Sequence, residues 1–179
     1  MRNIISTVFI LLIYTANAQE DVKSLFKKYP VESTGCMVYL PAPPGEWTAE
    51  KSVDSSDVYT ATVESEGMVF DAIVVQFKEP FTNLSAEEKE DILVSYLDYL
   101  QDAIGVYMSD GYEKGQSLSG FPNVTGIADY WEFDDGTQGK VKGWISDTHL
   151  AVLVVSADDD PSGNTATDTF LDGFRFPGK

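Results

Sequence analysis

Two segments of this chain are apolar on both faces of any strand they could form, and they constrain its fold most. Residues 68–77 are Met-Val-Phe-Asp-Ala-Ile-Val-Val-Gln-Phe, and residues 149–156 are apolar between His149 and Ser156. A strand of this kind needs packed layers above and below it. Both segments are therefore predicted to lie inside a sheet, and the rest of the chain must supply the other strands and the two covering layers.

The neighbouring sequence predicts an antiparallel hairpin and a meander around these central strands. Residues 58–64 alternate, with Tyr59, Ala61 and Val63 on one face, which is typical of a half-buried strand. Glu66-Gly67 predicts the turn into residues 68–77. Further strands are expected at 35–40, 112–118, 124–133 and 138–146, with Asp134-Asp135-Gly136 turning between the last two.

The clearest helix is predicted over residues 86–104. Ser85 and Glu88 form a capping-box pattern at its start, and Gly105 ends it. Its apolar stripe consists of Leu93, Tyr96, Leu97, Leu100 and Ile104. Shorter helices are expected at 22–29 and 165–171, with Phe174 and Phe176 returning to the core. An antiparallel sheet with helices packed on it, an α+β fold, satisfies this order of elements.

The first 18 residues have the pattern of a cleavable export signal. Arg2 precedes an apolar run, and Ala16-Asn17-Ala18 places small residues before a mature start at Gln19. A membrane anchor needs about 20 apolar residues, and this run is shorter. We therefore expect a secreted or periplasmic protein with no membrane span after cleavage. The expected organisation is a signal peptide (1–18), an N-terminal helical segment (19–34) and a single α+β domain (35–179).

Charge and cysteine content exclude several functions. The chain has 29 acidic and 12 basic residues, a formal net charge of −17. Such a charge repels nucleic acids and anionic membrane surfaces. The single cysteine, Cys36, cannot form an internal disulfide, and its apolar neighbours predict a buried residue rather than a nucleophile.

The order of several short motifs resembles a known fold. These motifs are Val38-Tyr39-Leu40-Pro41, Leu118-Ser119-Gly120-Phe121-Pro122, Leu150 to Val155, and Phe170-Leu171-Asp172-Gly173-Phe174. With the hairpins and the capped helix, they resemble small exported bacterial domains of the PsbP-like fold over residues 35–176. The resemblance implies an α/β/α sandwich around a curved, mainly antiparallel sheet.

Members of that fold include a photosystem extrinsic subunit and a Ran-binding import factor, which bind other proteins and are not enzymes. No functional residue of theirs can be matched onto this sequence. What the resemblance implies is therefore a binding role, and fold analogy alone does not identify a site.

No catalytic motif accompanies this pattern. The only histidine is His149, for which a structural role is predicted, and zinc, nucleophile-elbow and phosphate-loop motifs are missing from the sequence. The first hypothesis is a non-catalytic binding or accessory domain whose partner is another extracytoplasmic protein. The alternative is a carboxylate-based glycan hydrolase, although no pair of acids is singled out by its spacing.

A third hypothesis is calcium binding by the loop Asp158–Asn164. Asp158, Asp160, Ser162 and Gly163 match positions 1, 3, 5 and 6 of a calcium-binding loop. Position 12, however, is Thr169, where that loop requires a bidentate glutamate. The competing interpretation is a polar loop in which Ser162 or Asn164 caps the last helix.

Two aromatic residues are candidates for a partner or ligand surface. They are Trp144, which shares a strand face with Lys140 and Lys142, and Tyr130. A third aromatic residue, Trp131, is expected in the core instead. Asn83 and Asn123 begin N-glycosylation sequons, which matter only if the host modifies such sites.

Overall fold

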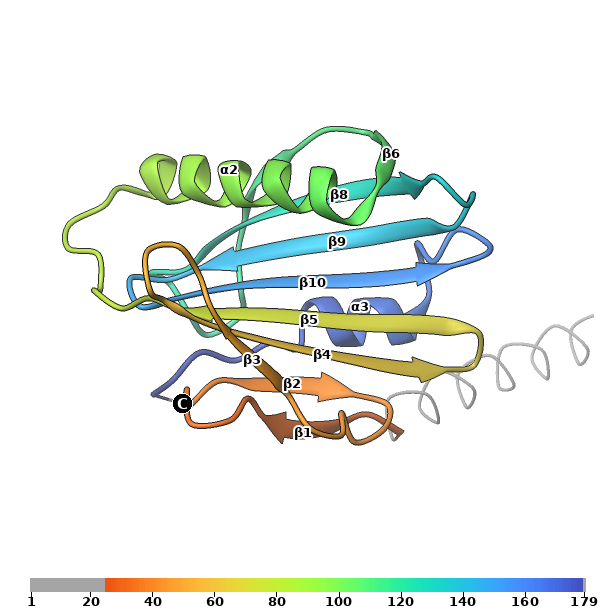
Figure 1. The fold of residues 1–179 in the computed structure, drawn as a ribbon, viewed down its shortest axis with the longest axis horizontal. Coiled ribbons are helices and arrows are strands. Elements are labelled where there is room, and N and C mark those ends of the chain that lie inside the picture. Colours follow the sequence, from red (N-terminus) through yellow and green to blue (C-terminus); the bar gives the residue numbers. More distant parts are fainter. Residues whose placement is uncertain (1–24, 179) are drawn as a thin grey trace, which may run out of the picture.

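The computed structural model describes residues 25–178 and shows a mixed α+β structure built on an antiparallel sheet (Figure 1). The main sheet, in spatial order, contains β3 (Thr48–Lys51), β4 (Asp57–Ser65), β5 (Met68–Gln76), β10 (His149–Ala157), β9 (Gln138–Ile145), β8 (Thr125–Phe133) and β6 (Val106–Ser109). β7 (Glu113–Gln116) also pairs with β8, and β1 (Lys27–Pro30) pairs with β2 (Met37–Leu40) in a second, small sheet. The helices that lie entirely within the described residues are α2 (Ala86–Ile104) and α3 (Thr165–Leu171). The predicted signal peptide lies outside the described residues.

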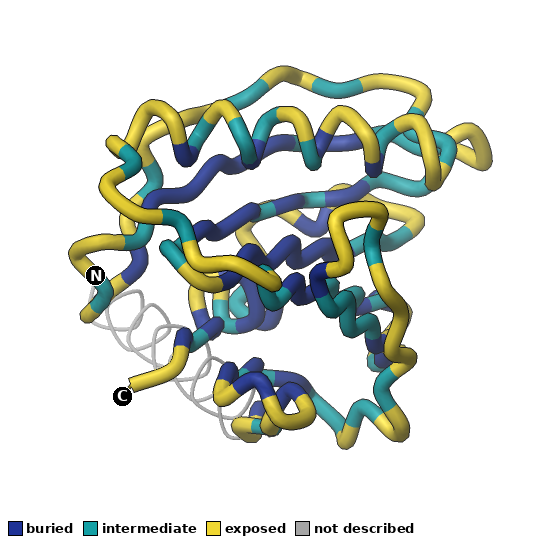
Figure 2. The backbone as a smooth tube through the Cα atoms, turned by 60° about the vertical axis from the view of Figure 1, so that its left-hand side comes forward, coloured by how far each residue is buried: buried dark blue, intermediate teal, exposed yellow. Residues whose placement is uncertain are grey.

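β10 lies in the middle of the sheet and divides the interior into two cores. Leu150, Val152 and Val154 point to one core, and the alternating residues Ala151, Leu153 and Val155 point to the other. β5 pairs with β10 along its whole length. The prediction that both apolar segments form interior strands is therefore confirmed, and Figure 2 shows the buried backbone concentrated in this part of the sheet.

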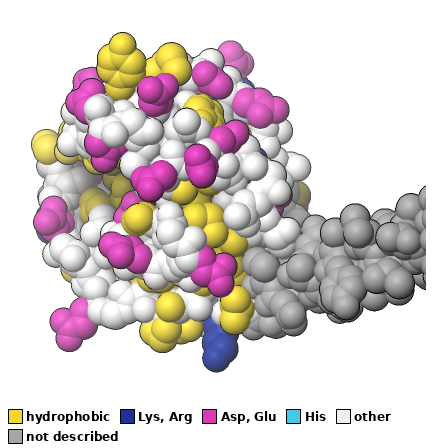
Figure 3. Space-filling model, turned by 90° about the vertical axis from the view of Figure 1, so that its right-hand side faces the viewer, with side chains coloured by type: hydrophobic (Ala, Val, Ile, Leu, Met, Phe, Trp, Pro, Cys, Tyr) yellow, Lys and Arg dark blue, Asp and Glu magenta, His cyan; other side chains and the backbone are white. Residues whose placement is uncertain are grey.

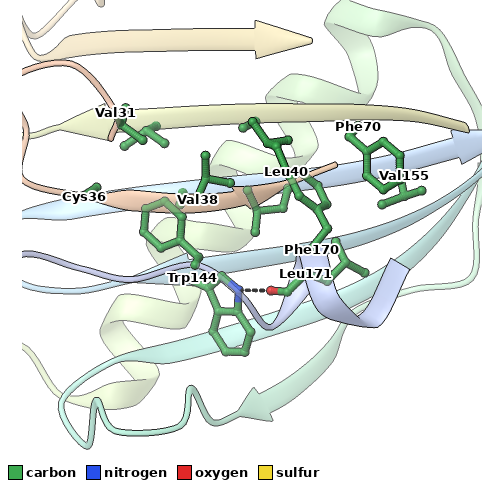
Figure 4. Close-up of a cluster of buried hydrophobic side chains, with 14 of the residues drawn as sticks. Val31, Cys36, Val38, Leu40, Phe70, Trp144, Val155, Phe170 and Leu171 are labelled. Carbon is green, nitrogen blue, oxygen red and sulfur yellow. Dashed lines mark hydrogen bonds between the residues drawn. The ribbon is translucent and has the colours of Figure 1, made fainter. Parts of the chain in front are cut away.

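The first core lies under α3 and the β1–β2 hairpin (Figure 4). Phe70 of β5 meets Phe170 of α3 edge to face, with ring centroids 5.4 Å apart. From the hairpin, Val38 and Leu40 are fully buried. The indole of Trp144 lies beneath α3 and donates a hydrogen bond of 2.9 Å to the carbonyl oxygen of Leu171.

The second core lies under α2. Leu93, Leu97 and Leu100 are buried against β8 and β9. The predicted capping box is confirmed, because the Ser85 hydroxyl accepts a hydrogen bond from the Glu88 N–H while the Glu88 carboxylate accepts one from the Ser85 N–H. Gly105 ends the helix with a φ of 76°, a left-handed conformation that favours glycine.

The N-terminal helix prediction is wrong from residue 27 onward, although Leu25 is helical. Residues 27–30, expected to continue a helix from residue 22, form strand β1 and pair with β2. The turn between them is closed by Val31 N–H donating to Cys36 O at 3.0 Å. Pairing with β2 and burial of Phe26 against Phe70 outweigh the local helical pattern. The boundary expected at residue 35 is therefore not a structural one.

The remaining differences concern short edge strands. β3 and β6 were not expected, and the strand predicted at 112–118 is limited to Glu113–Gln116. β6 follows directly from the reversal at Gly105 and pairs with the end of β8 through an irregular register. Four-residue strands carry too little periodicity to be recognised in a sequence.

Gly126 provides a test of how closely the sheet packs against Trp144. A Cβ added at Gly126 would lie 2.3 Å from Trp144 Cε3 and 2.8 Å from the Gly143 carbonyl oxygen. We expect Gly126→Ala to lower the free energy of unfolding by about 1–3 kcal/mol, measured by urea denaturation. In a Trp144→Leu background, the same substitution should cost clearly less, because the ring that it meets is gone. Equal costs in both backgrounds would contradict this account.

Candidate functional site

The most prominent concave surface of the described chain lies beside α2. α2 packs mainly on β8 and β9, so it does not extend over the same face of β4 and β5. Two pockets occupy that region, with volumes of about 690 and 510 Å³. Both are lined by Thr60 and Ile73, so they form one continuous depression, which we call the α2 groove.

One wall of the α2 groove is a second apolar stripe of α2. Ile92, Tyr96, Tyr99 and Ile104 line it along the length of the helix. By spacing, Ile92, Tyr96 and Tyr99 lie beside the buried stripe that begins at Leu93, whereas Ile104 continues that stripe beyond Leu100. Tyr99 is 65% exposed and Ile104 is 44% exposed, so this wall is open to solvent.

The floor of the groove is formed by β4 and β5. Val58 and Thr60 come from β4, and Ile73 and Val75 come from β5. The loop 52–54 closes one end, and the β8–β9 turn with Asp134 and Asp135 borders the other. The groove therefore runs parallel to the strands, with an apolar floor and polar ends.

Acidic side chains dominate the polar part of the groove. Its lining includes five acids, namely Glu50, Asp54, Asp71, Asp134 and Asp135. The sole base in that lining is Lys51, which forms an ion pair with Asp57 at 2.5 Å. Figure 3 views the end of the sheet where α2 ends and shows apolar side chains lying among numerous acidic ones.

The groove acids differ in their protonation behaviour. Burial raises the pKa of Asp71, whose carboxylate accepts a hydrogen bond from Thr62 on the neighbouring strand. Hydrogen bonds from Ser52 and Ser56 lower the pKa of Asp54, and those from Thr137 lower the pKa of Asp135. Asp54 and Asp135 therefore stay ionised at neutral and mildly acidic pH and supply fixed negative charge at the two ends.

Two polar anchors hold α2, and with it the groove wall, in place. Near its start, the buried Lys89 ammonium lies 2.7 Å from an Asp147 carboxylate oxygen and donates to the carbonyl oxygen of Asn123 at 3.1 Å. Near its end, Gln101 donates to the buried Asp129 carboxylate, which also accepts from the Trp131 indole at 2.7 Å. Asp129 accepts further hydrogen bonds from Ser109 and the Gly111 N–H, so it is saturated by structural partners.

The two aromatic residues predicted as a contact surface do not line this groove. The prediction for Trp144 is wrong: its side chain is only 1% exposed, because α3 covers it and Leu171 accepts its indole N–H. Tyr130 is half-buried, and its hydroxyl donates to Gln138. It lies on β8 between Asp129 and Trp131, which point to the α2 side, so Tyr130 points to the opposite face. Trp131 is fully buried, as predicted.

The candidate calcium loop is organised by its own hydrogen bonds. Asp160 accepts a hydrogen bond of 2.7 Å from the Ser162 N–H, and Asn164 caps α3 by accepting from the Ala166 N–H. Within residues 25–178, no group of three or more histidine, cysteine or acidic side chains could hold a metal ion. Calcium binding by Asp158, Asp160 and Ser162 stays a prediction.

His149 and Cys36 occupy buried positions. Burial raises the pKa of the Cys36 thiol to about 12, so the thiol is protonated at neutral pH and is a poor nucleophile, as expected. His149 is also buried, with Nδ1 at 2.7 Å from the Thr148 hydroxyl. Burial lowers the pKa of the imidazole, and a weaker interaction with the Thr34 backbone opposes this shift.

Both glycosylation sequons lie near the start of α2. Asn83 and Asn123 are exposed, on the two loops that meet at Lys89. Thr125, the hydroxyl residue of the second sequon, is buried and donates to Glu90 at 2.9 Å. Exposure of the asparagines agrees with glycosylation but does not test it.

The comparisons with known proteins identify no family. No protein-family model matches the chain, and no curated protein is similar to it at a significant level. No helix within residues 25–178 is both long and apolar enough to cross a membrane.

Sequence reasoning missed the α2 groove, although one of its signals was visible. Ile92, Tyr96 and Tyr99 follow i, i+4, i+7 spacing next to the stripe of Leu93, Leu97 and Leu100. Together, the two stripes form an apolar arc on α2 that is wider than packing against a single sheet requires. The position of Asp71 and Thr60 beneath this second stripe could not be inferred, because it depends on where α2 crosses the sheet.

His149 predicts a specific pH dependence of stability. Its folded pKa lies below the unfolded value of about 6.5, so the unfolded chain takes up a proton first as the pH falls. The free energy of unfolding should therefore decrease below about pH 6.5 in the wild type. His149→Asn should lose less stability between pH 7.5 and pH 5.0, as measured by urea denaturation at each pH. Parallel loss in both proteins would show that other groups cause the acid sensitivity.

Proposed function

We propose that this protein is an exported, non-catalytic binding module of PsbP-like fold, acting in a secreted or periplasmic location on another extracytoplasmic protein. The export pattern of residues 1–18 and the order of motifs over residues 35–176 support the location and the fold type. An antiparallel sheet with α2 on one face and α3 on the other agrees with that fold type.

The α2 groove is the observation that carries this proposal. Concave, mainly apolar surfaces with a few polar groups at defined positions are the usual form of a binding site. Here the exposed aromatic wall, the apolar floor and the charged ends come from separate elements, held in place by the Lys89 and Asp129 anchors. Tyrosine residues on such a wall offer a large contact area with little entropy to lose.

The alternative functions have less support. Asp129 is the most buried carboxylate in the described chain, but its oxygens are occupied by structural donors, so it is not free to act as an acid or base. A glycan hydrolase would have to use Asp71, whose raised pKa suits a general acid, with a second carboxylate across the groove.

Calcium binding by the loop with Asp158 and Asp160 has its own test. Titration with millimolar calcium should then release or absorb heat in a calorimeter, and this heat should disappear in Asp160→Asn.

Tyr99 and Tyr107 offer a matched test of the proposed site. Tyr107 is 72% exposed on β6 and lines neither pocket, whereas Tyr99 forms part of the groove wall. We expect the neutral apolar dye N-phenyl-1-naphthylamine to bind the wild type and Tyr107→Glu with enhanced fluorescence. Tyr99→Glu should weaken this binding about tenfold or more, because it places a charge in the apolar wall.

The same pair of variants tests the protein partner. Immobilised wild type and Tyr107→Glu should retain the same proteins from the host's extracytoplasmic fraction, and Tyr99→Glu should lose them. Retention by all three would place the contact elsewhere on the surface. Dye binding by none of them would show that the groove is not a binding site.

A further inference from the structure

The α2 groove has the dimensions of a missing helix. α2 packs on β8 and β9, and the side chains of β10 on this face are buried beneath it, which leaves β5, β4 and the short β3 as the adjoining strip of the same sheet face. Three neighbouring strands spaced about 4.8 Å apart span roughly 10 Å between their outer axes, which is about the diameter of an α-helix with its side chains. The groove runs from Phe77 to Asp71 along β5, roughly 20 Å at about 3.4 Å per residue.

The wall of the groove has the pattern of one half of a helix–helix contact. Ile92, Tyr96 and Tyr99 form a ridge at i, i+4 and i+7, in which Ile92 and Tyr96 are partly buried against the core and Tyr99 is exposed beside the open strip. Such ridges pack into the grooves of a neighbouring helix that lies nearly parallel. A helix placed there would touch the ridge on one side and Thr60, Ile73 and Val75 below.

The charge of the groove decides what kind of helix fits. Five acids and a single lysine, already paired with Asp57, line the two pockets. Asp54 and Asp135 lie at opposite ends and stay ionised because neighbouring hydroxyl and N–H groups donate to them. An acidic segment would be repelled, and so would a second copy of this chain, whose net charge is −17. A lysine- or arginine-bearing helix complements both ends.

We propose that the α2 groove receives a basic amphipathic helix of about 13 residues from the partner protein, laid alongside α2 with its apolar face on β4 and β5. This inference rests on the proposed function, because it names the occupant of the same groove. The bound helix completes the helical layer on this face of the sheet, and its basic residues lie near Asp54 at one end and Asp134 and Asp135 at the other.

A peptide series tests this directly on the full mature chain. The first peptide is a fluorescein-labelled 16-residue amphipathic helix with a leucine and phenylalanine face and a lysine face. The second has glutamate in place of lysine, and the third has two interior leucines replaced by proline so that it cannot form a helix. Binding is measured by fluorescence anisotropy at 20 and 200 mM salt.

Two triple variants separate local from overall charge. Asp54→Asn/Asp134→Asn/Asp135→Asn removes charge from the groove ends and keeps an acceptor oxygen at each position. Asp158→Asn/Asp159→Asn/Asp160→Asn removes the same charge from a loop that lines neither pocket. We expect the lysine peptide to bind the wild type, to lose roughly tenfold in affinity with the first variant and less than about twofold with the second. Its salt dependence should fall only in the first.

Several results would overturn the proposal. Equal binding of the glutamate peptide, or equal weakening by both triple variants, would remove the charge argument. Equal binding of the proline peptide would favour an extended strand, for which residues 61–65 of β4 offer an edge without a strand partner in the described chain. Self-association of the wild type that Tyr99→Glu abolishes would identify a second copy as the occupant.

The failure of this inference is distinguishable from failure of the proposed function. If the neutral dye binds and Tyr99→Glu prevents it, but no peptide binds, the groove is a binding site with a different occupant and the helix is excluded. If neither the dye nor any peptide binds, both the proposed function and the helix proposal are wrong.

Discussion

A sheet with apolar residues on both faces must be covered on both faces, and here the two covers are unequal. β10 directs Leu150, Val152 and Val154 to one side and Ala151, Leu153 and Val155 to the other. On the second side, α3 and the β1–β2 hairpin together bury the strands. On the first side, α2 is the one helix of the described residues that packs on the sheet, mainly over β8 and β9. The α2 groove is the consequence of that difference.

Buried polar groups fix where α2 lies and so determine the shape of the groove. Burying the Lys89 ammonium costs the free energy of its hydration, and the contacts with Asp147 and the Asn123 carbonyl oxygen offset that cost. The Asp129 carboxylate connects α2, β8 and β6 through Gln101, Trp131 and Ser109. Moving α2 across the sheet toward β4 and β5 would break both sets of contacts, so the helix cannot close the groove by sliding.

The folded structure shows where part of the acidic charge is located. A net charge of −17 alone describes a solvated surface that repels anions. In the structure, some of that charge lies around an apolar floor, where Asp54 and Asp135 are held in turns by their own hydrogen bonds. Apolar contact and fixed charge are then presented together, the combination that favours a basic amphipathic partner over a purely apolar one.

The sequence by itself determined the parts of this protein that depend on local pattern. The β4–β5 hairpin, the central strand β10 and the capped helix α2 follow from alternation, turn residues and the Ser85–Glu88 box. Burial of Trp131 and Cys36 followed from their apolar neighbours. These features need only a few adjacent residues to be specified.

Only the tertiary structure decided the features that depend on contacts between distant segments. Residues 27–30 form a strand because β2 pairs with them, and Trp144 is buried because α3 crosses it. The α2 groove brings residues 52–54, Asp71, Tyr99 and Asp135 together from four elements or loops. No local sequence pattern specifies that these residues lie close together, because their proximity depends on the position at which α2 crosses the sheet.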